Sequence, residues 1–140
     1  AYHGSVTDSL REGALAALSL ANARTVTVIT LSGAFEIPLV ARRAAASGAF
    51  DALVCLGCII RGETPHFDYI ASAVAHGITT ASQATGVPIT FGVLTTNTQD
   101  EAQARAGAGP ANKGWEAAMA AVQSANVVRV LPAGRGGAAE

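Results

Sequence analysis

The chain has 140 residues, of which 50% are hydrophobic and 14% charged, and its formal net charge is −1. This length fits one domain with its own core, and the scattered cations exclude the basic surface of a nucleic-acid-binding protein. No apolar segment is long enough to cross a membrane, and the start shows no secretory-signal pattern. Because few residues are charged, we expect part of the surface to be buried against other copies of the chain.

The first third of the chain predicts a helix, a strand and a second helix. Residues 5–21 carry apolar side chains at helical spacing. Residues 25–31 are β-branched and apolar, which indicates a strand. After Ser32 and Gly33, a helix is expected to run to Ala46 and to stop at Gly48.

Residues 51–60 contain a near-continuous run of Val, Ile, Leu and Cys, typical of a parallel strand buried on both faces. Thr64 is a suitable N-cap and Pro65 suits a first helical position, so a helix is expected from about Thr64 to Gly86, with Asp68 in its first turn.

The start of that helix is the strongest candidate site. Its unpaired backbone N–H groups can hold a phosphate or carboxylate where the strand ends. His66 lies in the same turn and belongs to the residue type best suited to proton transfer near neutral pH. The sequence therefore predicts an anion site beside a proton shuttle.

Cys55 and Cys58 form a C-x-x-C pattern inside the predicted strand. Residues three apart in a strand point to opposite faces and lie about 10 Å apart, whereas a disulfide needs Cα atoms within about 7 Å. Further zinc ligands at suitable spacing are lacking, so no metal site is expected. Two buried thiols suit a reducing compartment, and we expect a cytoplasmic protein.

The last third predicts a strand at 87–94, a short helix opened by the capping box Thr98 to Glu101, and a final helix from Asn112 to Asn126. Strands that alternate with helices predict a parallel sheet, whose ligands bind at the carboxyl ends of the strands. Residues 1–131 are expected to form a single domain, and the Gly- and Ala-rich residues 132–140 a disordered tail.

Four motifs resemble lumazine synthase, the 6,7-dimethyl-8-ribityllumazine synthase family. They are G-A-F-E-I-P at 33–38, I-I-R-G-E-T-P-H-F-D-Y at 59–69, V-P-I-T-F-G-V-L-T-T at 87–96, and A-R-A-G followed by N-K-G within 104–114. The resemblance covers roughly residues 1–126. It implies an α/β fold: a three-layer α/β/α sandwich with a parallel, flavodoxin-like sheet.

The resemblance also implies a transferase of riboflavin biosynthesis. Such an enzyme condenses 5-amino-6-(D-ribitylamino)uracil with 3,4-dihydroxy-2-butanone 4-phosphate to 6,7-dimethyl-8-ribityllumazine and releases phosphate and water. It uses no metal and no organic cofactor. Its site lies between neighbouring subunits of a homopentamer, and some members build 60-subunit shells. Pro110, which removes a backbone donor before N-K-G, favours a free pentamer here.

Motif matches assign the site residues. His66 would be the general acid/base. Glu63 and Thr64, with Arg105 of the adjacent subunit, would hold the phosphate. The pyrimidine and ribityl groups would contact Tyr2, Ala34, Phe35, Glu36, Cys58, Ile59, Ile60 and the neighbour's Phe91.

Several residues keep more than one interpretation. Lys113, the only lysine, either forms a Schiff base or supplies charge near the phosphate. Arg61 either orients the turn after the strand or pairs with a carboxylate. Glu36 and Arg105 would otherwise be charges at helix ends. His3 and His76 are expected in a loop and on the surface.

Two departures from the family pattern accompany the match. No counterpart of the family's first strand precedes Tyr2, and residues 127–131 form a β-like run that we expect to pair in the sheet. The alternative functions are a binding protein for riboflavin or lumazine without turnover and a shell component. The combination of His66, Thr64 and Arg105 argues against both, because neither role needs a phosphate site.

Overall fold

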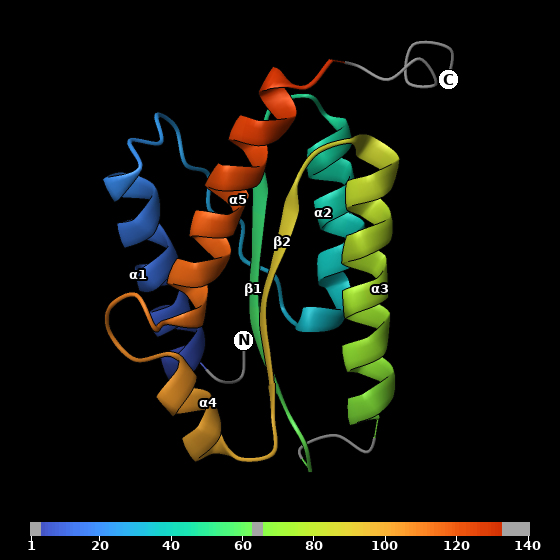
Figure 1. The fold of residues 1–140 in the computed structure, drawn as a ribbon. Coiled ribbons are helices and arrows are strands. Elements are labelled where there is room, and N and C mark those ends of the chain that lie inside the picture. Colours follow the sequence, from blue (N-terminus) through green and yellow to red (C-terminus); the bar gives the residue numbers. More distant parts are fainter. Residues whose placement is uncertain (1–3, 63–65, 133–140) are drawn as a thin grey trace.

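The computed structural model describes residues 4–62 and 66–132, and its elements form three layers (Figure 1). The central layer is a sheet of two parallel strands, β1 (Leu53–Ile60) and β2 (Ile89–Thr96). One face is covered by α1 (Gly4–Leu20), the short α4 (Gln99–Arg105) and α5 (Lys113–Val130). The other is covered by α2 (Ile37–Ala46), preceded by the 3-10 turn η1 (Ala34–Glu36), and by α3 (Phe67–Thr85). This arrangement confirms the predicted fold class.

The two strands run in register from Leu53 opposite Ile89 to Ile60 opposite Thr96. Helix α3 makes the crossover between them, as parallel pairing requires. Both strands therefore end at the same edge of the sheet. That edge carries the segments that lead into α3 and α4.

Apolar side chains fill the space on both faces of the sheet. Towards α2 and α3 the core includes Ile59, Val74 and Val93. Towards α1 and α4, Ile60 and Leu94 pack with a second set of residues, Val6, Leu10, Ala102 and Ala106. The prediction of a strand with both faces covered is confirmed for β1.

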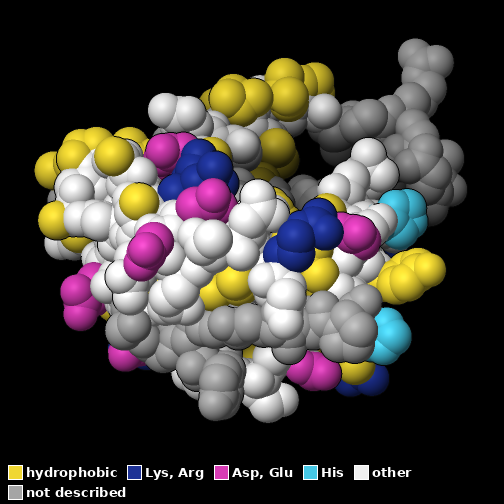
Figure 2. Space-filling model, turned by 90° about the horizontal axis from the view of Figure 1, so that it is seen from below, with side chains coloured by type: hydrophobic (Ala, Val, Ile, Leu, Met, Phe, Trp, Pro, Cys, Tyr) yellow, Lys and Arg dark blue, Asp and Glu magenta, His cyan; other side chains and the backbone are white. Residues whose placement is uncertain are grey.

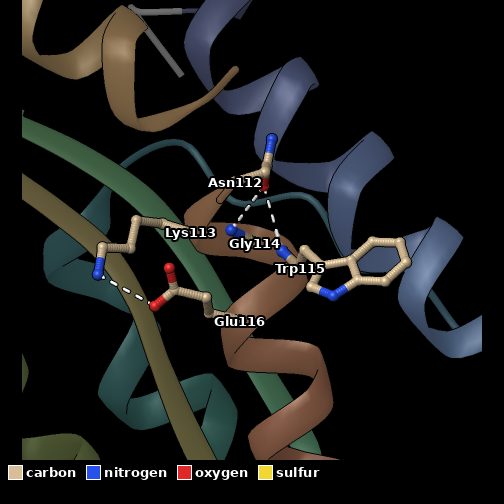
Figure 3. A network of polar contacts seen from close by, with 5 residues as sticks. All are labelled: Asn112, Lys113, Gly114, Trp115 and Glu116. Carbon is tan, nitrogen blue, oxygen red and sulfur yellow. Dashed lines mark hydrogen bonds and ion pairs between the residues drawn. The ribbon is translucent and has the colours of Figure 1, made fainter. Parts of the chain in front are cut away.

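The N-K-G motif joins α1 to α5 (Figure 3). Asn112 is 2% exposed and caps α5, because its Oδ1 accepts from the N–H groups of Gly114 at 2.7 Å and Trp115 at 3.1 Å. Its Nδ2 donates to the carbonyls of Ser9, Ala106 and Gly107 at 3.0, 3.1 and 2.8 Å. A Cβ at Gly114 would overlap the Leu10 carbonyl, so only glycine permits this close approach.

Residues 25–31 do not form the predicted strand. They are in coil, and most are exposed. A cavity of about 960 Å³ lies between this segment and β1 and is lined by both. The β-branched composition indicated a strand, but composition cannot supply a partner edge within hydrogen-bonding distance, and here β1 pairs only with β2 among the described residues.

The predicted pairing of residues 127–131 in the sheet is also wrong. Helix α5 continues through Val130, and the Leu131 N–H donates to the Val127 carbonyl at 3.2 Å. Leu131 then turns to extended backbone before Pro132, because a residue that precedes proline is disfavoured in helical conformation. The sequence places no helix breaker before that proline, so α5 continues through the β-branched residues Val127, Val128 and Val130.

Two element boundaries near the strand ends differ from those predicted. Helix α3 begins at Phe67 instead of about Thr64, because His66 has non-helical backbone angles of φ −107° and ψ 25°. Strand β2 ends at Thr96 instead of Leu94, since its pairing with β1 extends to the end of that strand. The capping box is confirmed, with the Glu101 N–H donating to Thr98 Oγ1 at 3.1 Å.

Cys55 and Cys58 are not joined in a disulfide, and Cys55 is buried as predicted whereas Cys58 is half-buried. Burial raises the pKa of the Cys55 thiol from 9.0 to about 12. None of the described helices is long and apolar enough to cross a membrane. Within residues 4–62 and 66–132, His, Cys, Asp and Glu side chains form no cluster that could hold a metal ion.

Candidate active site

The turn after β1 carries the predicted histidine to the edge of the sheet. Gly62 has a φ of 93°, a left-handed conformation that suits glycine, and the chain leaves the strand there. His66 is the N-cap of α3, and the Ile70 N–H donates to its carbonyl at 2.9 Å. Its imidazole is exposed and lies 6.3 Å from the Tyr69 ring, centroid to centroid. The histidine is thus exposed at the predicted edge of the sheet.

Arg61 stands between the two strand ends and the start of α3. Its Nε donates to Asn97 Oδ1 at 3.1 Å, and its Nη2 pairs with Asp68 Oδ1 at 3.3 Å. Its guanidinium lies 4.8 Å from the centre of the Phe67 ring. Both open interpretations of Arg61 therefore apply, because it pairs with a carboxylate and also touches the turn. Figure 2 views this end of the molecule, where acidic and basic side chains lie side by side and histidines lie at one margin.

The η1 turn carries a second set of predicted site residues, Ala34, Phe35 and Glu36. This turn contacts both β1 and α3. Ala34 is half-buried against the core, whereas Phe35 and Glu36 are exposed. The Glu36 carboxylate folds back over Gly33, since its Oε1 would lie 3.0 Å from a Cβ there. An exposed ring and a carboxylate are thus available beside the strand.

The three β1 residues expected to bond the pyrimidine ring lie at the carboxyl end of the strand. Ile59 and Ile60 are buried and Cys58 is half-buried, so their side chains belong to the core. Only their backbone can serve a ligand, in keeping with the expected role. Tyr2, Glu63 and Thr64, together with His3 and Pro65, lie outside the described residues.

The other predicted residues lie in α4, in α5 or on the face of the sheet that α5 covers. Phe91, on β2, is 44% exposed and shares a shallow hollow of about 300 Å³ with Lys113 and Glu116 of α5. The Lys113 Nζ pairs with Glu116 Oε1 at 3.1 Å (Figure 3). Arg105 is exposed at the last position of α4. Within one chain, α4 and α5 cover one face of the sheet, and α3, which His66 caps, covers the other (Figure 1).

Sequence reasoning missed four partners: Asn97, Phe67 and Asp68 around Arg61, and Glu116 beside Lys113. It treated Asn112 only as the start of a helix. The preference of asparagine for N-caps could have identified the capping role of Asn112. The hydrogen bond from Arg61 to Asn97 joins residues 36 positions apart, and no local pattern reveals such a pair.

The remaining histidine of the described chain behaves as a surface residue. His76 is exposed on α3, as predicted. Trp115 and Met119 pack against the α1–α5 core, so neither needs a cofactor to explain it.

A parallel sheet between two helical layers, with histidine, arginine and carboxylates where its strands end, defines an α/β domain of the class that binds ligands at that edge. Sequence comparison gives the family. The family model described as 6,7-dimethyl-8-ribityllumazine synthase matches residues 1–129.

Two curated relatives carry the same description. The 6,7-dimethyl-8-ribityllumazine synthase of Syntrophus aciditrophicus (strain SB) is 47% identical over 132 residues, which are 93% of this chain and 86% of the relative. That of Desulfatibacillum aliphaticivorans is 45% identical over 128 residues, 90% of this chain and 83% of the relative. The chain belongs to the 6,7-dimethyl-8-ribityllumazine synthase family, a family of riboflavin-biosynthesis transferases.

Proposed function

We propose that this chain forms 6,7-dimethyl-8-ribityllumazine from 5-amino-6-(D-ribitylamino)uracil and 3,4-dihydroxy-2-butanone 4-phosphate, with release of phosphate and water. Family membership supports the reaction. The observation that carries the residue assignment is the position of His66, exposed at the N-cap of α3 where β1 has just ended. Nothing in the geometry favours a binder without turnover.

Proton transfer is the task that we assign to His66. Imine formation, phosphate elimination and ring closure each move protons, and an imidazole can both accept and return them. The Tyr69 ring lies beside it, with the two ring centroids 6.3 Å apart. Much of the rate would come from holding the two substrates together.

The phosphate would be held by Glu63 and Thr64 and by Arg105 of an adjacent subunit. Arginine suits this role because its guanidinium can bond two phosphate oxygens at once. Lys113 is ion-paired with Glu116, which argues against a Schiff base, since covalent attack needs a neutral, unpaired amine.

The pyrimidine ring would stack between Tyr2 and the neighbour's Phe91 and bond the backbone of Cys58, Ile59 and Ile60. The ribityl hydroxyls would meet Ala34, Phe35 and Glu36, whose carboxylate can accept their hydrogen bonds. The exposed Phe35 and Phe91 rings support these contacts.

A homopentamer is the assembly that we propose, with each site completed by a neighbouring copy. His66 caps α3, whereas Lys113 and Arg105 belong to α5 and α4 on the opposite face of the sheet, and Phe91 of β2 lies beside α5. This separation supports two half-sites. Exposed apolar side chains support burial against other copies; they include Leu39, Val127, Val128, Val130 and Leu131. We place the enzyme in the cytoplasm, where its two free thiols would stay reduced.

The test is a fluorescence assay of lumazine formation with both substrates. His66→Ala should lower kcat by about 10²-fold, the lower range for loss of a general acid/base. His76→Ala, which removes an exposed histidine of the same helix, should match the wild type. A wild-type protein without turnover would reject the proposed reaction. An active His66→Ala variant would reject only the role of the histidine.

A further inference from the structure

We propose that Arg61 is a positioning residue for His66. It fixes the first turn of α3 against the ends of both strands, and the imidazole takes its place from that turn. The inference rests on the proposed function of His66 and adds to it a residue that acts through the backbone and not on the substrate.

The backbone of Arg61 is itself held by the sheet. Its N–H donates to the Thr96 carbonyl at 2.8 Å, which extends the ladder one residue beyond β1. The side chain therefore starts from a rigid point at the sheet edge. A side chain anchored in this way can set the position of whatever it contacts.

The guanidinium reaches the first turn of α3 in two places. It pairs with Asp68 at 3.3 Å and lies 4.8 Å from the centre of the Phe67 ring. Phe67 directly follows His66 and opens the helix. Because a planar guanidinium combines directed N–H groups with a stacking face, these two contacts restrain both the position and the rotation of the turn.

The same side chain also connects to α4. Its Nε donates to Asn97 at 3.1 Å, and the Asn97 N–H donates in turn to the Glu101 carboxylate at 2.9 Å. Glu101 belongs to the capping box that starts α4. Arg61 thus links the turn that carries His66 to the helix that ends at Arg105.

These contacts set the position of the first turn of α3 more than they stabilise the fold. The side chains of Arg61 and Asp68 are 56% and 78% exposed, and ion pairs this exposed add little to folding. The Asp68 carboxylate beside the guanidinium would also repel a second anion. Arg61 is therefore poorly placed to bind the substrate phosphate, and its removal should leave the chain folded.

Steady-state kinetics of Arg61→Ala test the proposal. We expect kcat to fall about tenfold or more, because small misplacements of a catalytic group are costly, while KM for the phosphate-bearing substrate changes less than about twofold. Arg61→Lys should recover part of the loss, since an ammonium can still pair with Asp68. Arg11→Ala is the matched control, because Arg11 pairs with Asp8 at 3.3 Å with exposed fractions of 44% and 58%.

A second readout does not depend on activity. In protein with isotope-labelled histidine, the imidazole resonances of His66 should shift in Arg61→Ala, while those of His76, on the same helix, should not. Asn97→Ala removes the hydrogen bond from Arg61 Nε, and Asp68→Asn removes the ion pair. Each should lower kcat and shift the His66 resonances less than Arg61→Ala does. They also replace Arg61→Ala if that variant does not fold.

The outcomes separate this inference from the proposed function. If the wild type forms no lumazine, the proposed function fails, and only the His66 resonances test the positioning role of Arg61. Resonances that shift in Arg61→Ala support this role, and resonances that do not shift reject it. If the wild type is active and Arg61→Ala equals Arg11→Ala, the inference is wrong and the function stands. A higher KM for the phosphate substrate at unchanged kcat, or a lower kcat without a shift of the His66 resonances, would make Arg61 a direct substrate ligand and overturn the positioning role.

Discussion

Cys55 lies in the core between β1 and the α2–α3 layer, where it is 7% exposed. Burial disfavours the thiolate and raises the pKa of this thiol to about 12. The half-buried Cys58, three residues along the strand, packs on the other side against the α1 and α4 core. The C-x-x-C pattern therefore serves packing, and its two thiols face different surroundings.

The stability of the protein should fall as pH rises from 9 to about 12. Below pH 9 the folded and unfolded chains both keep the Cys55 proton. Above it the unfolded chain releases the proton while the folded chain retains it, so unfolding becomes more favourable by at most about 1.4 kcal/mol per pH unit from this group.

Urea unfolding of wild type and Cys55→Ala across this range measures the effect. The variant should lose stability less steeply with pH than the wild type. Parallel pH curves for wild type and Cys55→Ala would show that the raised pKa makes no contribution.

At the scale of elements, the junction of α1 and α5 depends on Asn112. This side chain caps α5 and satisfies three carbonyls from α1 and the segment before α5. Glycines on both sides make room for it, because a Cβ at Gly13 would overlap Asn112 and one at Gly114 would overlap Leu10. The junction therefore leaves little freedom for substitution.

Asn112→Ala should lower the free energy of unfolding by roughly 3 kcal/mol, because it removes a cap and leaves buried carbonyls without donors. Asn126→Ala is the control on the same helix. Asn126 is exposed and accepts a hydrogen bond from the exposed Arg129, so its removal should cost less than about 0.5 kcal/mol. Denaturant unfolding compares the two. Equal losses would mean that the buried hydrogen bonds contribute nothing beyond ordinary packing.

At the scale of the whole molecule, His66 at the start of α3 and Arg105 at the end of α4 lie on opposite faces of the sheet (Figure 1). If neighbouring copies complete the site, two inactive variants should restore each other. His66→Ala and Arg105→Ala subunits are unfolded together, mixed in equal amounts and reassembled. About a quarter of the interfaces would then join an intact His66 to an intact Arg105, if subunits assort at random.

The mixed assembly should therefore regain about a quarter of wild-type turnover, whereas each variant reassembled alone should stay inactive. Sedimentation of the wild type checks the proposed pentamer. A mixture that remains as inactive as its parents, at the same assembly size, would place both residues in a site formed by one chain.

Local chemistry in the sequence determined much of the fold. The apolar run of β1, the capping box at Thr98, the start of the last helix at Asn112 and the end of α3 at Gly86 all lie where predicted, because each signal acts over a few residues. The position of His66 beside the end of β1 followed from the same short-range signals. The motifs then identified the family, which the comparisons confirm.

Tertiary structure decided what local patterns cannot express. Residues 25–31 have strand composition but no paired edge, and residues 127–130 include three β-branched valines yet continue a helix. Likewise, the sequence places Arg61 at the end of a strand, but only the tertiary structure shows its hydrogen bond to Asn97 and its ion pair with Asp68. Strand pairing and side-chain contacts across the chain depend on which distant segments come together, whereas caps and turns depend on immediate neighbours.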